Sequence, residues 1–283
     1  MKKMRMSVQS ILKKNLLFTL FFFICWSQAN SAGLDFKNIT SDDFSKLTNE
    51  LSAYSSYSSV SSAAGSTIRD IGFEIGLIGN LTLTPNINTI VEQTDPTIGF
   101  PRLPGGALLV AVSLPMTFKI EVLLLPQISF NDLSYQQFGV AVQYRILSAP
   151  LTTVLKAHIT KTASSFTEIL SNASTQNLPT NIQVNFEDTL LGLDLITSQN
   201  FVFAEPYFGL GYETANANLD VSGSTTASIF APAFTTAQTA GTNPTSLRIL
   251  IGAEFKLLSA RLGAEYLRAF ETNRFNIKLS LAF

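Results

Sequence analysis

The last nine residues of the chain alternate strictly between apolar and polar or small side chains. The odd positions carry Phe275, Ile277, Leu279, Leu281 and Phe283, while asparagine, lysine, serine and alanine occupy the positions between them. Successive side chains of a β-strand point to opposite faces, so this stretch predicts a strand with one apolar and one polar face. Such a strand is suited to a position with apolar surroundings on one side and polar surroundings on the other.

The same alternation recurs from residue 68 onward and predicts about ten strands. Besides residues 275–283 and a sixth strand at 182–195, apolar residues alternate in 71–77, 108–114, 118–124, 138–146, 151–162, 202–214, 247–256 and 262–266. The apolar positions of the sixth strand change from even to odd near Asp188, which predicts a bulge or two shorter strands. Hidden hairpins in 83–91 or 225–239 would raise the count to twelve, so the expected range is eight to twelve.

Hydrophobicity and strand length favour a membrane barrel over a secreted β-sandwich. Hydrophobic residues make up 46% of the chain and its mean hydropathy is +0.25. Even so, no stretch after residue 30 reaches the roughly 18 consecutive apolar residues of a membrane helix. Several alternating stretches run over nine or more residues, whereas strands of soluble proteins average about five or six. The predicted fold is all-β: a transmembrane, antiparallel, up-and-down β-barrel over residues 68–283, preceded by a short helix.

The connections between the predicted strands give an independent indication. Short turns are expected near Pro115 and at 147–150, 197–200 and 257–259, and the connections between them fall at 82–106, 126–133, 163–180, 215–245 and 271–274. Three of these five connections are long, whereas all four turns are short. Membrane barrels alternate short periplasmic turns with longer outer loops in this way.

The terminal strand resembles the C-terminal strand of bacterial outer-membrane β-barrels, which ends in Phe and is recognised by the barrel-assembly machinery. The resemblance implies that the five apolar residues from Phe275 to Phe283 form an insertion signal. It also implies location in a Gram-negative outer membrane, with the assembly machinery and membrane lipid as partners. Shorter stretches at 72–75, 112–115, 125–126 and 206–212 resemble an uncharacterised family of such barrels with a helical lead-in. That second resemblance implies no activity.

The amino terminus has the pattern of a secretory signal peptide. Five basic residues precede an apolar run, Leu16 to Trp26, and small residues follow it. This run is shorter than the roughly 20 apolar residues that span a bilayer. Residues 1–32 are therefore predicted to be a signal peptide, cleaved after Ala29 or Ala32.

Residues 33–67 predict a short helix followed by a flexible, serine-rich linker. Phe44, Leu47, Leu51 and Tyr54 recur at helical spacing, and serine dominates residues 55–66. Three positions for the helix are open: plugging the lumen, lying at the periplasmic mouth, or binding a partner. Ten strands place it in the periplasm, and a loosely packed periplasmic lead-in is the favoured hypothesis.

The polar faces of the strands carry nearly balanced charges. We predict that the lumen is lined by Glu74, Lys119, Glu121, Arg145, Lys156, His158, Asp194, Glu205, Glu213, Arg248, Glu254, Lys256, Arg261 and Glu265. A lining of one sign would favour ion selectivity, whereas a balanced lining favours paired charges. Open aqueous channels appear at about 16 strands, so ten predict a narrow or closed lumen. A gated or solute-conducting path is the alternative.

Two further hypotheses concern binding. Leu109, Leu123, Leu125, Leu250 and Leu267 lie at positions that face the lumen and could line a slot for a hydrophobic solute. Residues 215–245, rich in threonine, serine, alanine and asparagine, could form an adhesive surface, although a tolerated surface loop is the favoured interpretation.

Composition argues against several other classes of function. After residue 32 the chain has no cysteine and carries about −6 charges, 14 Lys and Arg against 20 Asp and Glu, which argues against disulfides and nucleic-acid partners. We find no pattern for a metal or a cofactor. Barrel hydrolases need a histidine base beside a hydroxyl, and His158 is the one candidate. We therefore expect no enzyme but a structural or porin-like barrel passing small or hydrophobic solutes, with surface binding as the alternative and hydrolysis as the least supported.

Overall fold

The computed structural model describes residues 41–63, 71–94, 101–130, 133–171, 179–225 and 235–283. The expected signal peptide lies outside the described residues, so its cleavage remains a prediction. Within the described residues, one antiparallel sheet holds the strands β1 Gly72–Leu83, β2 Arg102–Leu114, β3 Phe118–Phe130, β4 Leu133–Leu147, β5 Thr152–Ser171, β6 Pro179–Ser198, β7 Ala204–Thr225, β8 Thr235–Thr242, β9 Thr245–Leu257, β10 Ala260–Ala269 and β11 Thr272–Ala282.

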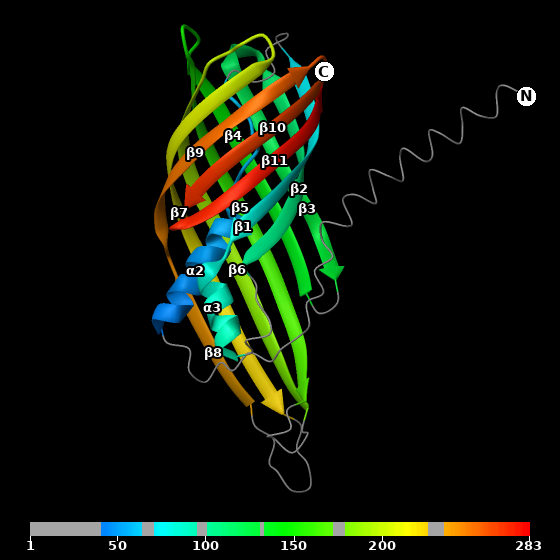
Figure 1. Cartoon of the computed structure of the whole chain (residues 1–283), viewed down its shortest axis with the longest axis vertical. Helices are drawn as coiled ribbons and strands as arrows, with labels where there is room; N and C mark the ends of the chain where they lie inside the picture. Colours follow the sequence, from blue (N-terminus) through cyan, green and yellow to red (C-terminus); the bar gives the residue numbers. More distant parts are fainter. Residues whose placement is uncertain (1–40, 64–70, 95–100, 131–132, 172–178, 226–234) are drawn as a thin grey trace, which may run out of the picture. The chain divides into compact units, whose positions relative to one another are not determined.

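Ten of these strands close into a barrel, as predicted (Figure 1). The first and last strands meet, with the Phe73 and Phe283 backbones exchanging hydrogen bonds of 3.0 and 2.8 Å. β7 pairs with both β6 and β9, which completes the ring. One further strand, β8, pairs with the far part of β7 outside the ring. It contains residues 235–239 of the stretch expected to hide a hairpin, and residues 226–234 lie outside the described residues.

The two ends of the barrel differ. The short-turn end holds Phe283 and the connections β2–β3, β4–β5, β6–β7 and β9–β10, the first of which is the 3-10 turn Pro115–Thr117. The long-loop end holds the other connections, and the β1–β2 connection contains a helix there, α3 Pro85–Thr94, rather than a hairpin. The β5–β6 connection is shorter than expected because both strands continue into it.

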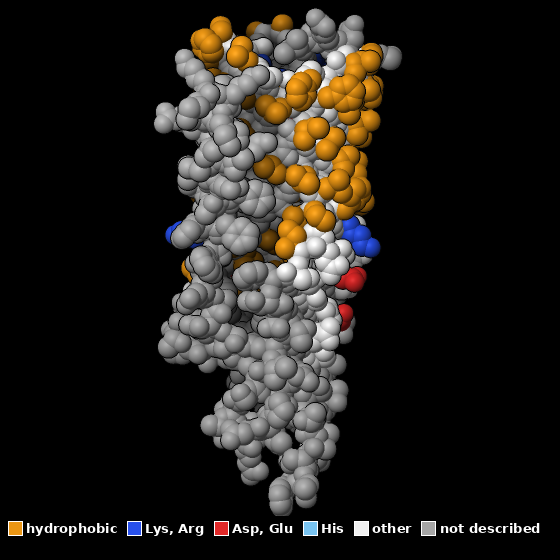
Figure 2. All heavy atoms as spheres, turned by 90° about the vertical axis from the view of Figure 1, so that its right-hand side faces the viewer, with side chains coloured by type: hydrophobic (Ala, Val, Ile, Leu, Met, Phe, Trp, Pro, Cys, Tyr) orange, Lys and Arg blue, Asp and Glu red, His pale blue; other side chains and the backbone are white. Residues whose placement is uncertain are grey.

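The outer surface carries the apolar face of the strands. Ile277 is 61% exposed, and Leu193, Leu210 and Phe275 are also exposed. Figure 2 shows apolar side chains gathered over the upper part of the surface in view, with charged side chains below them. Because lipid-facing and interior residues alternate along membrane strands, this surface is the lipid-facing belt of the barrel.

The sixth predicted strand is neither bulged nor divided. β6 pairs in continuous register with β5 and β7 along its length. Leu191, Leu193 and Leu195 are exposed outside, whereas Phe186 and Leu190 are buried inside. The apolar pattern changes phase because the strand leaves the apolar belt and its inner face then packs against a helix.

That helix is α2, Ser41–Ser55, and it lies at the long-loop end instead of the short-turn end expected for a periplasmic lead-in. Its Phe44 and Leu51 pack with Phe186 and Leu219 of β6 and β7. Both strands extend past the apolar belt, so their inner faces would otherwise be uncovered. None of the described helices has the length and apolar character to cross a membrane.

A carboxylate joins α2 to α3. Glu50 of α2 accepts hydrogen bonds from the backbone N–H groups of Asn86 (2.7 Å) and Ile87 (2.8 Å) in the first turn of α3. The first N–H groups of a helix lack partners within the helix, and a negative charge there also interacts favourably with the helix dipole. The two helices thus form one unit at the long-loop end.

This topology predicts that α2 and the short turns face opposite sides of the membrane. We expect Asp42→Cys and Leu258→Cys, each made in a Cys25→Ser chain, to react with an impermeant maleimide from opposite sides of uniformly oriented vesicles. Asp42 lies on α2 with a 74% exposed side chain, and Leu258 is fully exposed in the β9–β10 turn. Labelling of both cysteines from the same side would contradict the placement of α2.

Candidate functional site: the occupied interior of the barrel

The barrel encloses its own N-terminal segment. Residues 52–63, which we call the inner segment, are buried apart from Tyr54, which is half-buried. Ser56 lies near Glu213 in the middle of β7, whereas Ser62 lies near Glu205 at its start, so the segment runs from the long-loop end towards the short-turn end. Residues 55–63 of the serine-rich run, the part that the structure describes, are therefore not a flexible linker as expected. From Ser56 to Ser62, each serine hydroxyl contacts a partner that lies far away in the sequence.

The inner segment enters through an apolar collar. The end of α2 brings Ala53 into a cluster of buried apolar side chains from four strands and a turn: Leu190, Ala215, Leu250, Leu267, Ala269 and Phe270. Ala53 is fully buried there. A small residue at this position lets the chain pass between leucines that would otherwise meet.

The backbone of the inner segment is bonded to the wall by side chains. Gln137 donates to the Ser55 carbonyl (2.8 Å), Arg274 to the Tyr54 carbonyl (3.0 Å), and Arg248 to the Tyr57 carbonyl (2.8 Å). A buried backbone outside regular secondary structure needs such partners, because an unpaired carbonyl is costly to bury.

Tyr57 is the largest anchor of the inner segment. Its hydroxyl donates to Glu121 (3.1 Å), and its ring stacks on His158 with centroids 5.2 Å apart. The same ring joins an apolar cluster of Val60, Ile78, Leu109, Leu123 and Ala141. Leu109 and Leu123, expected to line a slot for a hydrophobic solute, pack against this anchor instead. Leu250 and Leu267 belong to the collar, and Leu125 is half-buried.

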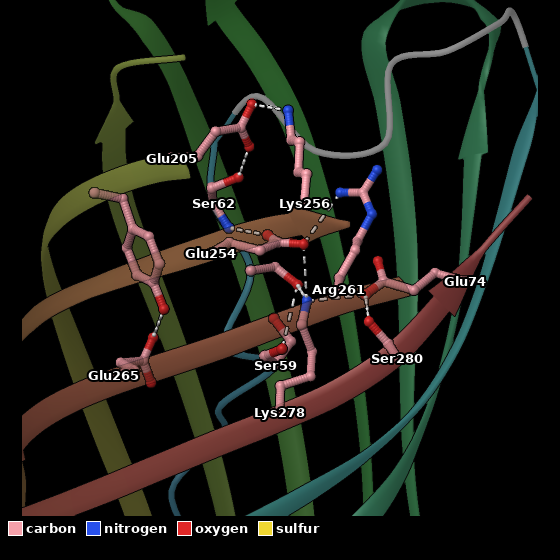
Figure 3. A network of polar contacts seen from close by, with 12 residues as sticks. Ser59, Ser62, Glu74, Glu205, Glu254, Lys256, Arg261, Glu265, Lys278 and Ser280 are labelled. Atoms are coloured by element: carbon pink, nitrogen blue, oxygen red, sulfur yellow. Dashed lines mark hydrogen bonds and ion pairs between the residues drawn. The ribbon is translucent and has the colours of Figure 1, made fainter. Parts of the chain in front are cut away.

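Serine hydroxyls of the inner segment donate to carboxylates of the wall. Ser56 donates to Glu213 (2.7 Å), and Ser58 donates to Glu265 (2.6 Å). Further down, the Ser62 hydroxyl donates to Glu205 and its backbone N–H to Glu254 (3.2 Å) (Figure 3). Hydrogen bonds to ionised groups are stronger than neutral ones.

Other serines accept hydrogen bonds from lysines. Lys156 donates to the Ser59 hydroxyl (2.8 Å), while Lys119 (3.4 Å) and Lys278 (3.3 Å) both donate to Ser61. The uncharged segment thus donates hydrogen bonds to carboxylates of the wall at some positions and accepts them from lysines at others.

The wall charges also pair with one another. Lys278 contacts Glu74 at 2.8 Å and Glu254 at 3.4 Å, and Figure 3 shows Arg261 reaching the same Glu254 (3.1 Å). Four further ion pairs of this region are Lys119–Glu74, Lys119–Glu121, Lys156–Glu121 and Lys256–Glu205. Such pairing lowers the cost of burying ions, which is high for an isolated charge.

A second group of charges lies nearer the long-loop end. Arg248 contacts Asp194 (3.3 Å) and Glu213 (3.2 Å), and its Nη1 lies 2.9 Å from the Nε2 atom of His158. His158 also lies 3.3 Å from Asp194. These contacts place His158 within a polar network under the Tyr57 ring.

The structure buries most of the predicted lumen-lining residues on the inner face. Twelve are buried: Glu74, Lys119, Glu121, Lys156, His158, Asp194, Glu205, Glu213, Arg248, Glu254, Arg261 and Glu265. Arg145 and Lys256 are half-buried. That these residues line a path for a solute remains a prediction. The list omitted Lys278, Arg274, Asn276 and Gln137, which are also buried inside. Two of these, Asn276 and Lys278, alternate with the apolar residues of the terminal strand, so strand parity alone indicates that they face inward.

The five apolar residues from Phe275 to Phe283 lie on the outer face of β11, each about half or more exposed. Their role as an insertion signal stays a prediction. Across the described ranges, no group of three or more His, Cys, Asp or Glu is arranged to hold a metal ion.

A glycine provides a test of the inner segment's packing. A Cβ atom on Gly263 would lie 2.7 Å from Val60 Cγ1 and 3.1 Å from the Val60 carbonyl oxygen. We expect Gly263→Ala to lower the free energy of unfolding by about 1–3 kcal/mol, the usual cost of overpacking. Gly79→Ala, whose Cβ would meet only the Ile277 side chain at 3.3 Å, is the matched control. Equal denaturation midpoints for the two variants would contradict the close approach.

Several solved structures of outer-membrane proteins are similar to the chain at low sequence identity. The outer membrane protease OmpT from Escherichia coli is 10% identical, with 77% of this chain and 98% of that chain covered and a TM-score of 0.38. The translocator domain of the autotransporter NalP from Neisseria meningitidis is 10% identical, with coverages of 86% and 95% and a TM-score of 0.39. The outer membrane protein Omp33 of Acinetobacter baumannii is 8% identical, with coverages of 75% and 97% and a TM-score of 0.28.

At these identities and TM-scores the likeness carries no conclusion about what the chain does. No curated protein matches the chain. The model of a family of unknown function, DUF6588, matches residues 39–283, and the chain belongs to this family.

Proposed function

We propose that the protein is a channel of the bacterial outer membrane whose conduit is closed by the inner segment. The closed barrel with an apolar belt supports the location, since only helices and closed barrels satisfy their backbone inside lipid. The observation that carries the proposal is the burial of an uncharged, hydroxyl-rich segment along a charged interior. A segment that filled the lumen permanently would not need hydroxyl contacts that water can replace.

The wall is able to hold its charges without the inner segment. Glu121, Glu205, Glu213 and Glu254 each contact at least one wall cation besides the hydrogen bond from the segment. Water molecules can replace serine hydroxyls at little cost, because a typical hydrogen bond contributes only about 0.5–1.5 kcal/mol net, or about twice that with a charged partner. On this proposal the inner segment occupies the barrel but can be replaced there by water.

Surface binding is a second candidate, favoured by one observation. A groove of about 660 Å³ lies at the long-loop end, lined by α2 and by the connection between β8 and β9. Its lining includes polar side chains from α2 and from the strand ends: Ser45, Asn49, Thr242, Asn243, Arg268 and Glu271. This groove would serve the adhesive alternative without requiring an open lumen.

The proposal predicts that a charge placed against Glu265 opens the channel. Ser58 donates to Glu265, whose other partners are the neutral Tyr207 hydroxyl and Asn276 amide. Ser58→Asp sets two carboxylates against each other, a repulsion of about 4 kcal/mol at 4 Å near an effective dielectric constant of 20. We expect refolded Ser58→Asp protein to show steady conductance in planar bilayers, where the wild-type chain is mostly closed.

Ser61→Asp is the matched control, because Ser61 accepts from Lys119 and Lys278. The same substitution three residues away adds a favourable charge there and is expected to leave the barrel closed. Closed Ser58→Asp protein would argue against a displaceable plug, and equal conductance of the two variants would argue against an electrostatic cause.

A further inference from the structure

The inner segment is chemically a row of hydroxyl groups. Between Ser56 and Ser62, five of the seven side chains are serine, Tyr57 adds a phenol, and Val60 is the one side chain without a hydroxyl. No residue of this stretch is charged. The wall therefore surrounds a neutral chain of hydroxyls that lies along the proposed conduit.

The wall offers both kinds of partner to these hydroxyls. Carboxylates such as Glu213 and Glu265 accept hydrogen bonds, whereas the Lys156 and Lys278 ammonium groups donate them. An ammonium can only donate and a carboxylate can only accept, but a hydroxyl does both. A neutral solute with many hydroxyls matches a wall of both donors and acceptors better than a solute with a single kind of group.

The wall also presents apolar surfaces between the charges. Leu109, Leu123 and Ile78 cover Tyr57 and Val60, and Tyr207 packs near Ala63 with its hydroxyl 2.9 Å from Glu265. Such surfaces would meet the C–H faces of a sugar ring, while the neighbouring charges would meet its hydroxyls.

Charged solutes match the wall less well. Lys278 is paired with Glu74 and Glu254, and Arg248 with Asp194 and Glu213. An entering ion would lose its hydration and would have to compete for partners that are already paired. A neutral solute avoids this cost.

We infer that the conduit accepts neutral, hydroxyl-rich solutes of the saccharide class, for which the inner segment is the built-in substitute. The inference rests on the proposed channel function and names its substrate class.

The test uses the full-length chain carrying Ser58→Asp, with Ser62→Asp, which faces Glu205 and Glu254, as an independent second opened form. Liposome swelling compares glucose with two charged solutes of similar size, glucosamine and glucuronate. Bilayer recordings measure how strongly maltose and maltotriose block the ionic current. We expect glucose to enter faster than both charged solutes, and the oligosaccharides to block the current in a concentration-dependent manner.

A wall substitution ties the block to the proposed contacts. Adding Glu213→Gln to the opened chain should weaken the oligosaccharide block by about tenfold, the loss expected for one charge-assisted hydrogen bond. Glu187→Gln, at an exposed position of β6, should leave it unchanged.

The outcomes separate the inference from the function. If neither opened form conducts, the channel function fails and the saccharide inference fails with it. If both conduct but glucose and the charged solutes enter at rates set by size alone, or a charged solute enters faster, the channel stands and the saccharide inference is wrong.

Discussion

The charges inside the barrel are the constraint on which the rest of the structure depends. Every second residue of a closed barrel points inward, so a polar inner face places carboxylates and ammonium groups where water has little room. Glu121 is fully buried and is surrounded by Lys119, Lys156 and the Tyr57 hydroxyl. Wall residues pair with one another, and the inner segment supplies further hydrogen bonds. The lumen is closed because the inner segment, which is part of the same chain, occupies this polar interior.

Two kinds of interaction hold this occupant, and they differ in how easily water replaces them. Each serine hydrogen bond contributes about 0.5–1.5 kcal/mol net, or about 1.5–3 where its partner is charged. Full burial of a large apolar side chain contributes about 1.5–3 kcal/mol that water cannot restore. Such burial is concentrated at Tyr57 and Val60 within the barrel and at Phe44 of α2, beside which Leu51 is partly buried. The serines thus determine the register of the segment, while these apolar contacts supply its less replaceable attachment.

The alternation of apolar residues was enough to predict a ten-stranded barrel because its period reports two different environments. It was misleading in β6, where Phe186 is apolar and faces inward only because α2 covers it. The serine-rich run was predicted as a linker because serine has little preference of its own. Its structure comes from partners such as Glu205, which is 143 residues away from Ser62 in the sequence. The inner-face charges could be read from strand parity, but their pairing across strands and their contacts with the segment could not.

Topology limits how such a segment can leave. Ile71 precedes β1 at the short-turn end, whereas α2 is docked at the long-loop end, so the chain between them must cross the barrel while both attachments hold. In the proposed channel, emptying the conduit would require α2 to separate from β6 and β7 and the segment to lie at the short-turn end. The contacts of Phe44 and Leu51 would therefore have to break before the proposed conduit opens, together with the Glu50 link to α3. These contacts lie beyond the apolar belt of the barrel, where a binding partner has access to them.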